Sequence, residues 1–506
     1  MISENVNSEK VPFEVAIDKT GFGLYSYILA ALTGLVIVSY GCIGYGSTII
    51  VPSSACELNT TSAQQGLLVS APIIGAIIGA ILWGYVADRH GRRSMLLVSL
   101  LSSSAINAVA SLSVNWIMLL ILQFIATLSS SGQYTISMTI LCESVPMAKR
   151  NTVLLLVTSI FLMAQGIMAA LAMPVIPLTF SYHLSSLGIY WNSWRTLILV
   201  YSIPSLVCAA WLMFMQESPK YTLAQGDEER TIQILRLIHR INNRNTNEEL
   251  QGTTEHAAHL MVKGILQESL QVKTSTKNQI LPLFKRPLVK YTLIMTILSV
   301  FHQVTAFGVW LPTIANKYVK LLQTGQGSDL TLCGIYNADI EIAEDADAVP
   351  CALNITALVI VLGVGALNSI INILISVIVV YTGRRNTVIV IAAFSGTSGT
   401  LINLVPNAIV SLVLFGIYLM AMMLIGLYTA ISVALFPTNL RALAVSLTMT
   451  GVRIGSFASI QILKFLLVNN CEVGFYVYAS ILTLSAVVAS FLPNDRLLMQ
   501  QKEVSE

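Results

Sequence analysis

The chain has 506 residues, of which 55% are hydrophobic and only 10% are charged, and its formal net charge is +3. Soluble globular proteins carry about a quarter charged residues, so this composition excludes that class and indicates a protein embedded in a lipid bilayer. No metal-binding cluster, nucleophile triad or phosphate-binding loop stands out in the sequence. We therefore predict no enzymatic activity, cofactor, metal site or nucleic-acid partner.

Twelve mostly apolar runs are long enough to cross a bilayer as helices, which takes about 20 residues each. Six precede a long polar stretch and six follow it, so we expect an all-α multi-pass protein with two six-helix bundles. The runs are 24–51, 65–87, 94–112, 115–141, 152–174, 194–215, 291–312, 354–380, 387–405, 408–432, 442–468 and 474–492. The predicted units are an amino-terminal segment (1–23), a first bundle (24–215), a linker (216–290), a second bundle (291–492) and a tail (493–506).

The distribution of basic residues predicts the orientation of these helices. Most of the 28 lysines and arginines fall in segments that would share one side of the membrane, and the loops on the other side contain only Lys317 and Lys320. Lysine and arginine are enriched in cytoplasmic loops. We therefore expect both termini and the linker to be cytoplasmic, in a plasma membrane or an intracellular vesicle membrane.

Covalent modifications are expected on the opposite side. Two N-x-S/T sequons, at Asn59 and Asn354, fall in predicted outer loops and are candidate glycosylation sites. Cys333 and Cys351 share one outer loop, where oxidation is possible, and we predict a disulfide bond between them.

A charged turn separates the second and third apolar runs. It has the pattern G-x-x-x-D-R-x-G-R-R and comprises Gly84, Asp88, Arg89, Gly91, Arg92 and Arg93. An ordinary basic cytoplasmic turn is one interpretation. The spacing, however, resembles the hallmark loop between helices two and three of major facilitator superfamily transporters. This resemblance implies the major facilitator fold, with its two pseudo-symmetric bundles of six helices.

Other short segments resemble signatures of the sugar, organic-ion and synaptic-vesicle branches of that superfamily. They are Glu143-Ser-Val-Pro-Met-Ala-Lys-Arg150, Glu217-Ser-Pro-Lys-Tyr221 and Phe436-Pro-Thr-Asn-Leu-Arg441. The resemblance implies a cytoplasmic gate in which Glu143 and Glu217 bridge to Arg92, Arg93 and Arg150, with Asp88 at the start of helix 11. The second half keeps Arg384, Arg385 and Arg441 but lacks the matching acidic residues.

Polar residues recur every three or four positions along the fourth, seventh and tenth runs. Such spacing places them on one helix face, and a polar face inside a membrane must contact protein or water. Hydrogen bonding between helices would produce the same pattern as a cavity lining. In a facilitator fold, helices 1, 4, 7 and 10 surround the central cavity. The predicted cavity residues are Tyr40, Gln123, Thr127, Tyr134, His302, Gln303, Trp310, Asn368, Asn372, Tyr418 and Arg453.

Arg453 falls near the middle of the eleventh run, where an unpaired charge costs several kcal/mol. No Asp or Glu lies deep within any predicted helix, so this arginine needs carbonyls, hydroxyls, water or an anionic ligand. Substrate contact and structural bonding both remain open. Among candidate residues of the path, only His302 has an ordinary pKa near physiological pH. Facilitated or exchange transport is therefore favoured over proton symport.

The chain as a whole resembles the synaptic vesicle glycoprotein 2 and organic-ion transporter branch. Tyr40 and Ile43 stand where the vesicle proteins of that branch have acidic residues, so the resemblance carries over the fold and not the substrate. We expect a monomeric alternating-access carrier of an unidentified small polar or ionic organic solute. The alternative is a non-transporting membrane glycoprotein with a trafficking or receptor role.

Overall fold

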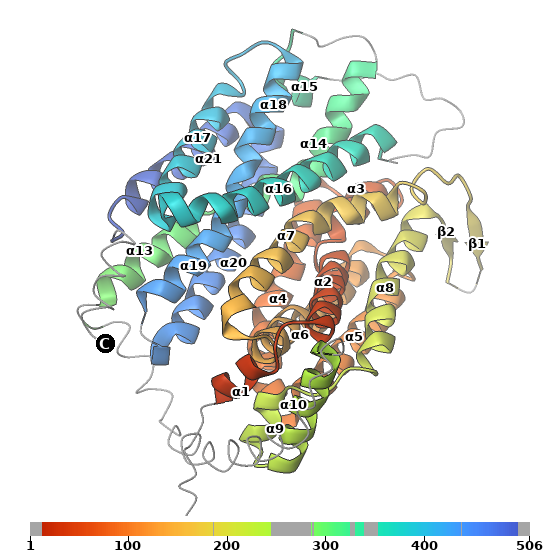
Figure 1. Ribbon diagram of the computed structural model, residues 1–506. Coiled ribbons are helices and arrows are strands. Elements are labelled where there is room, and N and C mark those ends of the chain that lie inside the picture. The colour runs from red at the N-terminus through yellow and green to blue at the C-terminus, as the bar shows by residue number, and fades with distance from the viewer. Residues whose placement is uncertain are drawn as a thin grey trace, which may run out of the picture.

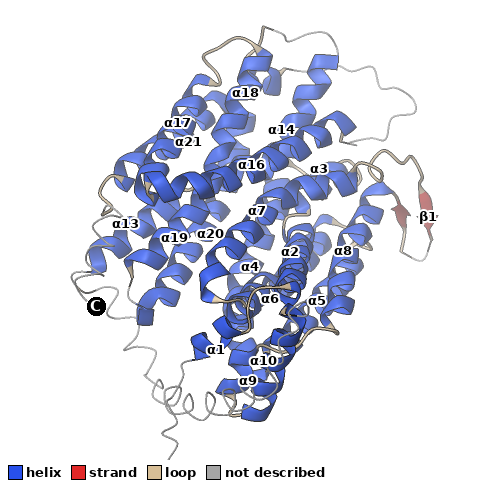
Figure 2. Ribbon diagram, viewed as in Figure 1, coloured by secondary structure: helices blue, strands red, loops and turns tan. Residues whose placement is uncertain are grey.

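A computed structural model describes residues 13–185, 187–243, 285, 288–323, 329–338, 353–436 and 438–493. At positions 148, 151, 380, 433, 434 and 438–446 it describes the backbone alone. The described residues are almost entirely helical, and one small antiparallel hairpin pairs β1 (Tyr182–Leu184) with β2 (Ile189–Trp191) (Figure 2). Each of the twelve predicted runs forms helix, which confirms the all-α architecture.

The first half of the chain contains six membrane-crossing segments and three short helices at one end. Its helices are α1 (Phe13–Lys19), α2 (Leu24–Gly44), α3 (Ser47–Ser54), α4 (Ser62–His90), α5 (Arg92–Ala110), α6 (Trp116–Ser144), α7 (Met147–Ala172), α8 (Ser193–Leu212), α9 (Pro219–Ala224) and α10 (Glu228–Asn242). The first predicted run is divided between α2 and α3, which meet at Tyr45 and Gly46.

The second half also contains six long helical segments, together with the short helix α15. Its elements are α13 (Leu288–Phe301), α14 (Thr305–Gln323), α15 (Leu332–Asn337), α16 (Ile355–Thr382), α17 (Arg384–Leu401), α18 (Ala408–Leu419), the 3₁₀ turn η2 (Met420–Met423), α19 (Leu424–Leu435), α20 (Thr438–Asn469) and α21 (Cys471–Ala489). The seventh run is interrupted between α13 and α14, and the tenth tightens at η2.

Within the described residues, eleven helical segments are long and apolar enough to cross a membrane. The ninth predicted run, α17, is not among them. Its first turn holds two arginines and its last turns are rich in glycine, serine and threonine. It nevertheless packs along α21 inside the second half, so it occupies the position that the sequence predicts.

Equivalent glycines terminate equivalent helices in the two halves. Gly91 follows α4 with φ at +98°, and Gly383 follows α16 with φ at +80°. Residues with a side chain rarely adopt this left-handed region, so glycine permits the sharp reversal into the next helix. Arginines follow both glycines immediately. The repeated Gly-Arg turn is the clearest local sign that the halves are related.

The two halves pack side by side, with the red-to-yellow first half against the green-to-blue second half (Figure 1). Their main contacts join α7 to α16 and α4 to α20. Between α7 and α16, a Cβ on Gly365 would lie 3.0 Å from the backbone nitrogen of Gly166. Small residues at this crossing allow the two backbones to approach closely, as is common between helices in membranes.

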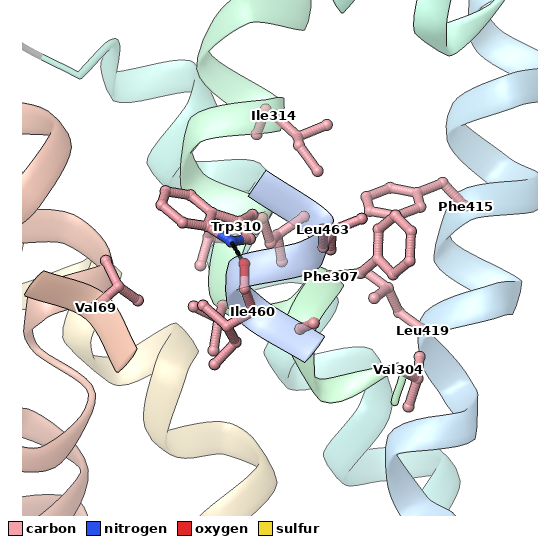
Figure 3. Packing of buried hydrophobic residues seen from close by; sticks show 14 of the residues in the cluster. Val69, Val304, Phe307, Trp310, Ile314, Phe415, Leu419, Ile460 and Leu463 are labelled. Carbon is pink, nitrogen blue, oxygen red and sulfur yellow. Dashed lines mark hydrogen bonds between the residues drawn. The ribbon is translucent and has the colours of Figure 1, made fainter. Parts of the chain in front are cut away.

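Two names describe the ends of the bundle. The DR-loop end holds Gly84–Arg93 together with α1, α9 and α10. The disulfide end is the opposite one, which holds the β-hairpin and the bond between Cys333 and Cys471. Near the disulfide end, Trp310 packs with Ile460 and Leu463 of α20 in a cluster that also includes Val69 from the first half (Figure 3).

Candidate functional site

The predicted gate forms a group of ion pairs at the DR-loop end. The guanidinium of Arg92 pairs with Glu143 of α6 and lies 3.4 Å from Asp88. Ser218, just before α9, donates a hydrogen bond of 2.5 Å to the same Glu143 carboxylate. Glu143 thus holds α5, α6 and the start of the linker together, and the predicted Arg92–Glu143 bridge is present.

Glu217 was predicted to bridge to arginine side chains, but in the structure it bonds to backbone amides. Its Oε1 accepts hydrogen bonds from the backbone amides of Arg93, at 2.8 Å, and Ser218, at 3.0 Å. The residue before α5 is Gly91, which has no side chain to cap the helix, so Glu217 supplies the missing acceptor. The Arg93 guanidinium instead donates to the carbonyl oxygens of Leu212 and Met213.

Arg150 also has a partner that the sequence did not predict. It pairs with Glu14 of α1 at 2.9 Å rather than with Glu143 or Glu217. On the same short helix, Asp18 accepts a hydrogen bond of 2.7 Å from the backbone amide of Met147, the first residue of α7. A detectable signal existed in the sequence, because Phe13 and Ile17 alternate with these acids at helical spacing.

The gate residues of the second half bond to backbone oxygens. Arg384 donates to the Ala430 carbonyl at 3.1 Å and Arg385 to the Ser490 carbonyl at 2.5 Å. The side chain of Arg441 lies outside the described part of the chain. So do the other side chains at the start of α20, the helix end beside which Asp88 was expected. The Asp88 side chain is 71% exposed. Among the described residues, no atom beyond the neighbours and helix backbone of Gly84 lies within 4 Å of a Cβ placed on it.

A cleft of about 300 Å³ opens beside these ion pairs. It is lined by Glu14, Met138, Thr139, Cys142, Glu143, Arg150 and Lys220. Its charged lining residues form or flank the pairs already described, so the cleft belongs to the DR-loop end and not to the middle of the bundle.

Four aromatic rings form a closed group near the middle of the first half. Tyr40 and Tyr45 come from the first run, Tyr134 from α6 and Phe161 from α7, with neighbouring ring centroids 5.7–6.1 Å apart. We call these four residues the aromatic group. The aromatic group thus brings together two predicted cavity residues of the first half, Tyr40 and Tyr134. Arg453 of the second half donates a hydrogen bond of 3.2 Å to the Ala76 carbonyl of α4.

Two other predicted cavity residues of α6 lie inside the packing of the first half. Gln123 donates a hydrogen bond of 3.1 Å to Asn107 of α5, which in turn donates to Ser202 of α8. The Thr127 hydroxyl donates to the carbonyl of Gln123. These contacts correspond to the interhelical hydrogen bonding that the sequence left open as the alternative to a cavity lining.

The predicted cavity residues of the seventh and tenth runs are mostly buried within the second half. His302 lies at the break after α13 with both ring nitrogens buried and unbonded, and its ring meets Tyr428 edge-on at 5.9 Å. Neighbouring Gln303 donates to the Val300 carbonyl. Tyr418 packs against Phe307.

Trp310 donates to the Ile460 carbonyl at 3.3 Å, as the dashed line in Figure 3 shows. Two asparagines of α16 are also buried. Asn372 donates a hydrogen bond of 2.9 Å to Ser159 of α7 and so joins the two halves, and Asn368 lies one turn away on the same helix.

The predicted disulfide between Cys333 and Cys351 is wrong. Cys333 is bonded to Cys471, with their Cα atoms 5.6 Å apart, although 138 residues separate them in the chain. The fold brings the start of α21 beside α15, and spacing along the sequence does not reveal this proximity. Cys351 lies outside the described residues. Glycosylation of Asn59 and Asn354 stays a prediction, and Asn354 caps the start of α16.

The most strongly bonded charged residue escaped the sequence-based prediction. Arg195 is fully buried near the disulfide end and donates to Glu57, at 2.6 Å, and to the carbonyls of Tyr190, Ser111 and Ser113. Glu57 also accepts hydrogen bonds from the side chains at positions 192 and 194. These contacts join loops of the first half, and each of the three guanidinium nitrogens of Arg195 donates at least one hydrogen bond.

Known families match this architecture. The family model of the Major Facilitator Superfamily matches residues 33–460, most of the chain. The chain belongs to the Major Facilitator Superfamily. Solved structures of superfamily members agree: the xylose transporter XylE from E. coli, in a partially occluded inward-open conformation, superposes with a TM-score of 0.65 at 18% identity. That likeness covers 93% of this chain and all of the other chain, and it concerns the fold alone.

Among curated superfamily relatives, synaptic vesicle glycoproteins 2A and 2B are similar in sequence. The 2B protein of Mus musculus is 26% identical over 269 residues, which cover 52% of this chain and 38% of that protein. The 2A protein of Homo sapiens is 26% identical over 233 residues, which cover 46% and 31%. The chain thus spans less than two fifths of the length of these relatives. The resemblance to the synaptic-vesicle branch is confirmed, at 26% sequence identity.

Proposed function

We propose that this protein is a transmembrane carrier that moves a small polar or ionic organic solute by alternating access. The observation that carries the proposal is the distribution of bonds between the two halves. The hydrogen bonds that described residues form between halves lie in the middle and toward the disulfide end: Ser159–Asn372, Ala76–Arg453, Gln165–Gly308 and Ser70–Gln461. Such an arrangement is suited to a bundle that opens at one end at a time.

The ion pairs at the DR-loop end support the same mechanism. Those that described residues form, Arg92–Glu143, Arg92–Asp88 and Arg150–Glu14, lie within the first half and its amino-terminal helix. They would keep that half rigid while the second half moves against it. We propose that the DR-loop end faces the cytoplasm and that transport is facilitative or an exchange. Superfamily membership adds support.

Flux through proteoliposomes tests the proposal. The purified protein is reconstituted and uptake is measured for organic anions, organic cations and sugars. The control variant is Gly66→Trp, because a Cβ on Gly66 already lies 2.6 Å from Gln461 and a large side chain would hold the disulfide end apart. We expect saturable uptake of at least one solute class by the wild type and loss of uptake in Gly66→Trp. Solute binding without flux in the wild type would contradict transport and favour a receptor role.

A further inference from the structure

The β-hairpin at the disulfide end carries a group of exposed apolar side chains. Tyr182 of β1 is 68% exposed and Tyr190 of β2 is 54% exposed, and Leu187 in the turn between the strands is exposed as well. The hairpin belongs to the segment 173–192 between α7 and α8, which contains no Asp, Glu, Lys or Arg. Exposed apolar side chains gathered in one place mark a surface that contacts another molecule or a membrane.

The strand register divides the hairpin into two faces. Side chains alternate between the faces along each strand, so His183 and its partner Tyr190 share one face, and Leu184 and its partner Ile189 share the other. Ile189 is buried, so its face contacts the protein at the turn end of the hairpin. The rings of His183 and Tyr190 have their centroids 4.9 Å apart, and both residues are exposed. These two rings form the outward face of the hairpin.

Hydrogen bonds hold the root of the hairpin against α8. The Arg195 Nε donates to the Tyr190 carbonyl at 3.0 Å, and the Trp191 indole donates to the Thr196 hydroxyl at 3.1 Å. Arg195 also bonds to Glu57, in the loop before α4. A lone two-stranded hairpin is at best marginally stable in water. The first half therefore fixes the hairpin at its root and presents its outward face.

The hairpin lies at the depth of a membrane surface. It connects α7 and α8, which are both long and apolar enough to cross a membrane, and α8 begins two residues after β2. Figure 1 shows the hairpin beside the first part of α8, with its turn directed back toward the DR-loop end. It therefore runs alongside a membrane-crossing helix near its end, where the lipid headgroups lie, rather than projecting beyond that end.

We propose that the hairpin is a membrane anchor that lies among the lipid headgroups of the leaflet at the disulfide end. Tyrosine suits this region, because its ring contacts the acyl chains while its hydroxyl stays hydrated. The outer edges of the two strands carry unpaired backbone groups, which water satisfies among the headgroups but not in the hydrocarbon core. The anchor is thus shallow and uncharged.

The anchor has a consequence for the first half. A lipid contact at Tyr190 acts next to Arg195, which bonds to Glu57, so it fixes the disulfide end of the first half in the membrane. The inference concerns lipid contact alone, and it holds whether or not the protein transports a solute.

A spin label on the turn measures the depth of the hairpin. Leu187→Cys is made in a Cys142→Ser background, in which Cys42 and Cys208, both buried, are the other free cysteines. The labelled chain is reconstituted in phosphatidylcholine vesicles. Power saturation then compares the accessibility of the label to oxygen, which concentrates in lipid, with its accessibility to a nickel chelate, which concentrates in water.

Two other labelled positions supply reference values. Ser62→Cys is exposed at the start of α4, at the disulfide end, and Val207→Cys is exposed on α8. We expect the oxygen-to-nickel ratio at position 187 to exceed that at position 62 severalfold and to approach that at position 207. A ratio equal to that at position 62 would place the hairpin in water and overturn the inference. Low accessibility to both reagents would overturn it too, because protein such as a second copy of the chain would then cover the hairpin.

A charge on the outward face tests which side chain holds the hairpin in the leaflet. Tyr190→Glu places a carboxylate against lipid, so the ratio at position 187 should fall to the value at position 62. Tyr190→Phe keeps the ring and should leave the ratio unaltered. The matched control is Tyr381→Glu, at an exposed tyrosine of the DR-loop end, which should also leave it unaltered. If Tyr190→Glu retains the Cys333–Cys471 bond of the folded chain and the parent ratio, the inference is wrong.

Discussion

The two ends of the bundle use charge in opposite ways. At the disulfide end, Arg195 is 1% exposed at its side chain and its partner Glu57 is 25% exposed, and three carbonyl oxygens also accept hydrogen bonds from Arg195. At the DR-loop end, Asp88 is 71% exposed and the Glu14–Arg150 pair is partly open to solvent. Buried and fully bonded charges resist separation, whereas exposed pairs exchange partners at little cost. The comparison indicates that the Asp88 and Glu14 pairs at the DR-loop end can rearrange, whereas the Arg195–Glu57 pair and the mostly buried Arg92–Glu143 pair hold the first half together.

The largest expected effect is that of Glu57→Gln, which leaves Arg195 buried without its carboxylate. Removing one member of a buried pair costs about 3–5 kcal/mol of stability. Denaturant titration in detergent micelles measures the loss. The matched change at the other end, Glu14→Gln, should cost about 1 kcal/mol or less, because its pair is partly exposed. Equal losses would remove the distinction between the ends.

Removal of the disulfide should cause the next largest loss of stability. Cys471→Ser should lower stability by about 2–4 kcal/mol, because the bond with Cys333 closes a long loop in the unfolded chain. The control is Cys142→Ser, a free cysteine near the DR-loop end, which should cost much less. Peptide mapping without reduction should join the Cys333 and Cys471 peptides. A Cys333–Cys351 peptide would restore the original prediction and contradict the structure.

Two acidic residues of the DR-loop end should differ in how much they contribute to the free energy of unfolding. Glu143→Gln weakens the acceptor shared by Arg92 and Ser218, so we expect a loss of about 1–3 kcal/mol in the free energy of unfolding. Asp88→Asn changes an exposed pair with the same Arg92 and should cost about 0.5 kcal/mol or less. A larger loss from Asp88→Asn, in the same denaturant titration, would reverse the roles assigned to them.

A smaller effect than that of Glu143→Gln is expected in the linker. Gly23 precedes α2 and has no side chain for capping, and Asn242 of α10 accepts a hydrogen bond of 3.0 Å from the backbone amide of Tyr25 instead. Asn242→Ala should cost about 1 kcal/mol, the usual value of a helix cap. Hydrogen exchange at the start of α2 should speed up accordingly. Gln225→Ala, an exposed change in the same linker, should leave that exchange unaltered, and equal rates in both variants would refute the cap.

Hydropathy alone was enough to predict the helices, because a helix that crosses a bilayer needs a long apolar run. Each predicted run forms helix in the structure. Hydropathy did not predict the breaks in the first, seventh and tenth runs, since composition does not register a turn such as the one at Tyr45 and Gly46. The helix α1 was also missed. Its polarity marked it as a plain cytoplasmic segment, whereas Glu14 and Asp18 bond to the first turn of α7 across more than a hundred residues.

The candidate site was predictable in its residue types and less so in its contacts. The polar spacing on α6 identified Tyr134, which joins the aromatic group, together with Gln123, which bonds to Asn107 inside the first half. Spacing specifies a helix face but not which neighbours that face meets. Arg453 stood out because a charge at mid-membrane needs a partner, and its bond to Ala76 of the other half required the tertiary structure.

Paired spin-label distances test alternating access most directly. One label pair spans the halves at the DR-loop end, on Tyr85 and Tyr381, and another spans them at the disulfide end, on Val114 and Leu404; all four positions are exposed. In Gly66→Trp the disulfide-end distance should lengthen and the DR-loop distance should shorten relative to the parent protein. A longer distance at both ends, or an unchanged DR-loop distance beside an opened disulfide end, would contradict the mechanism.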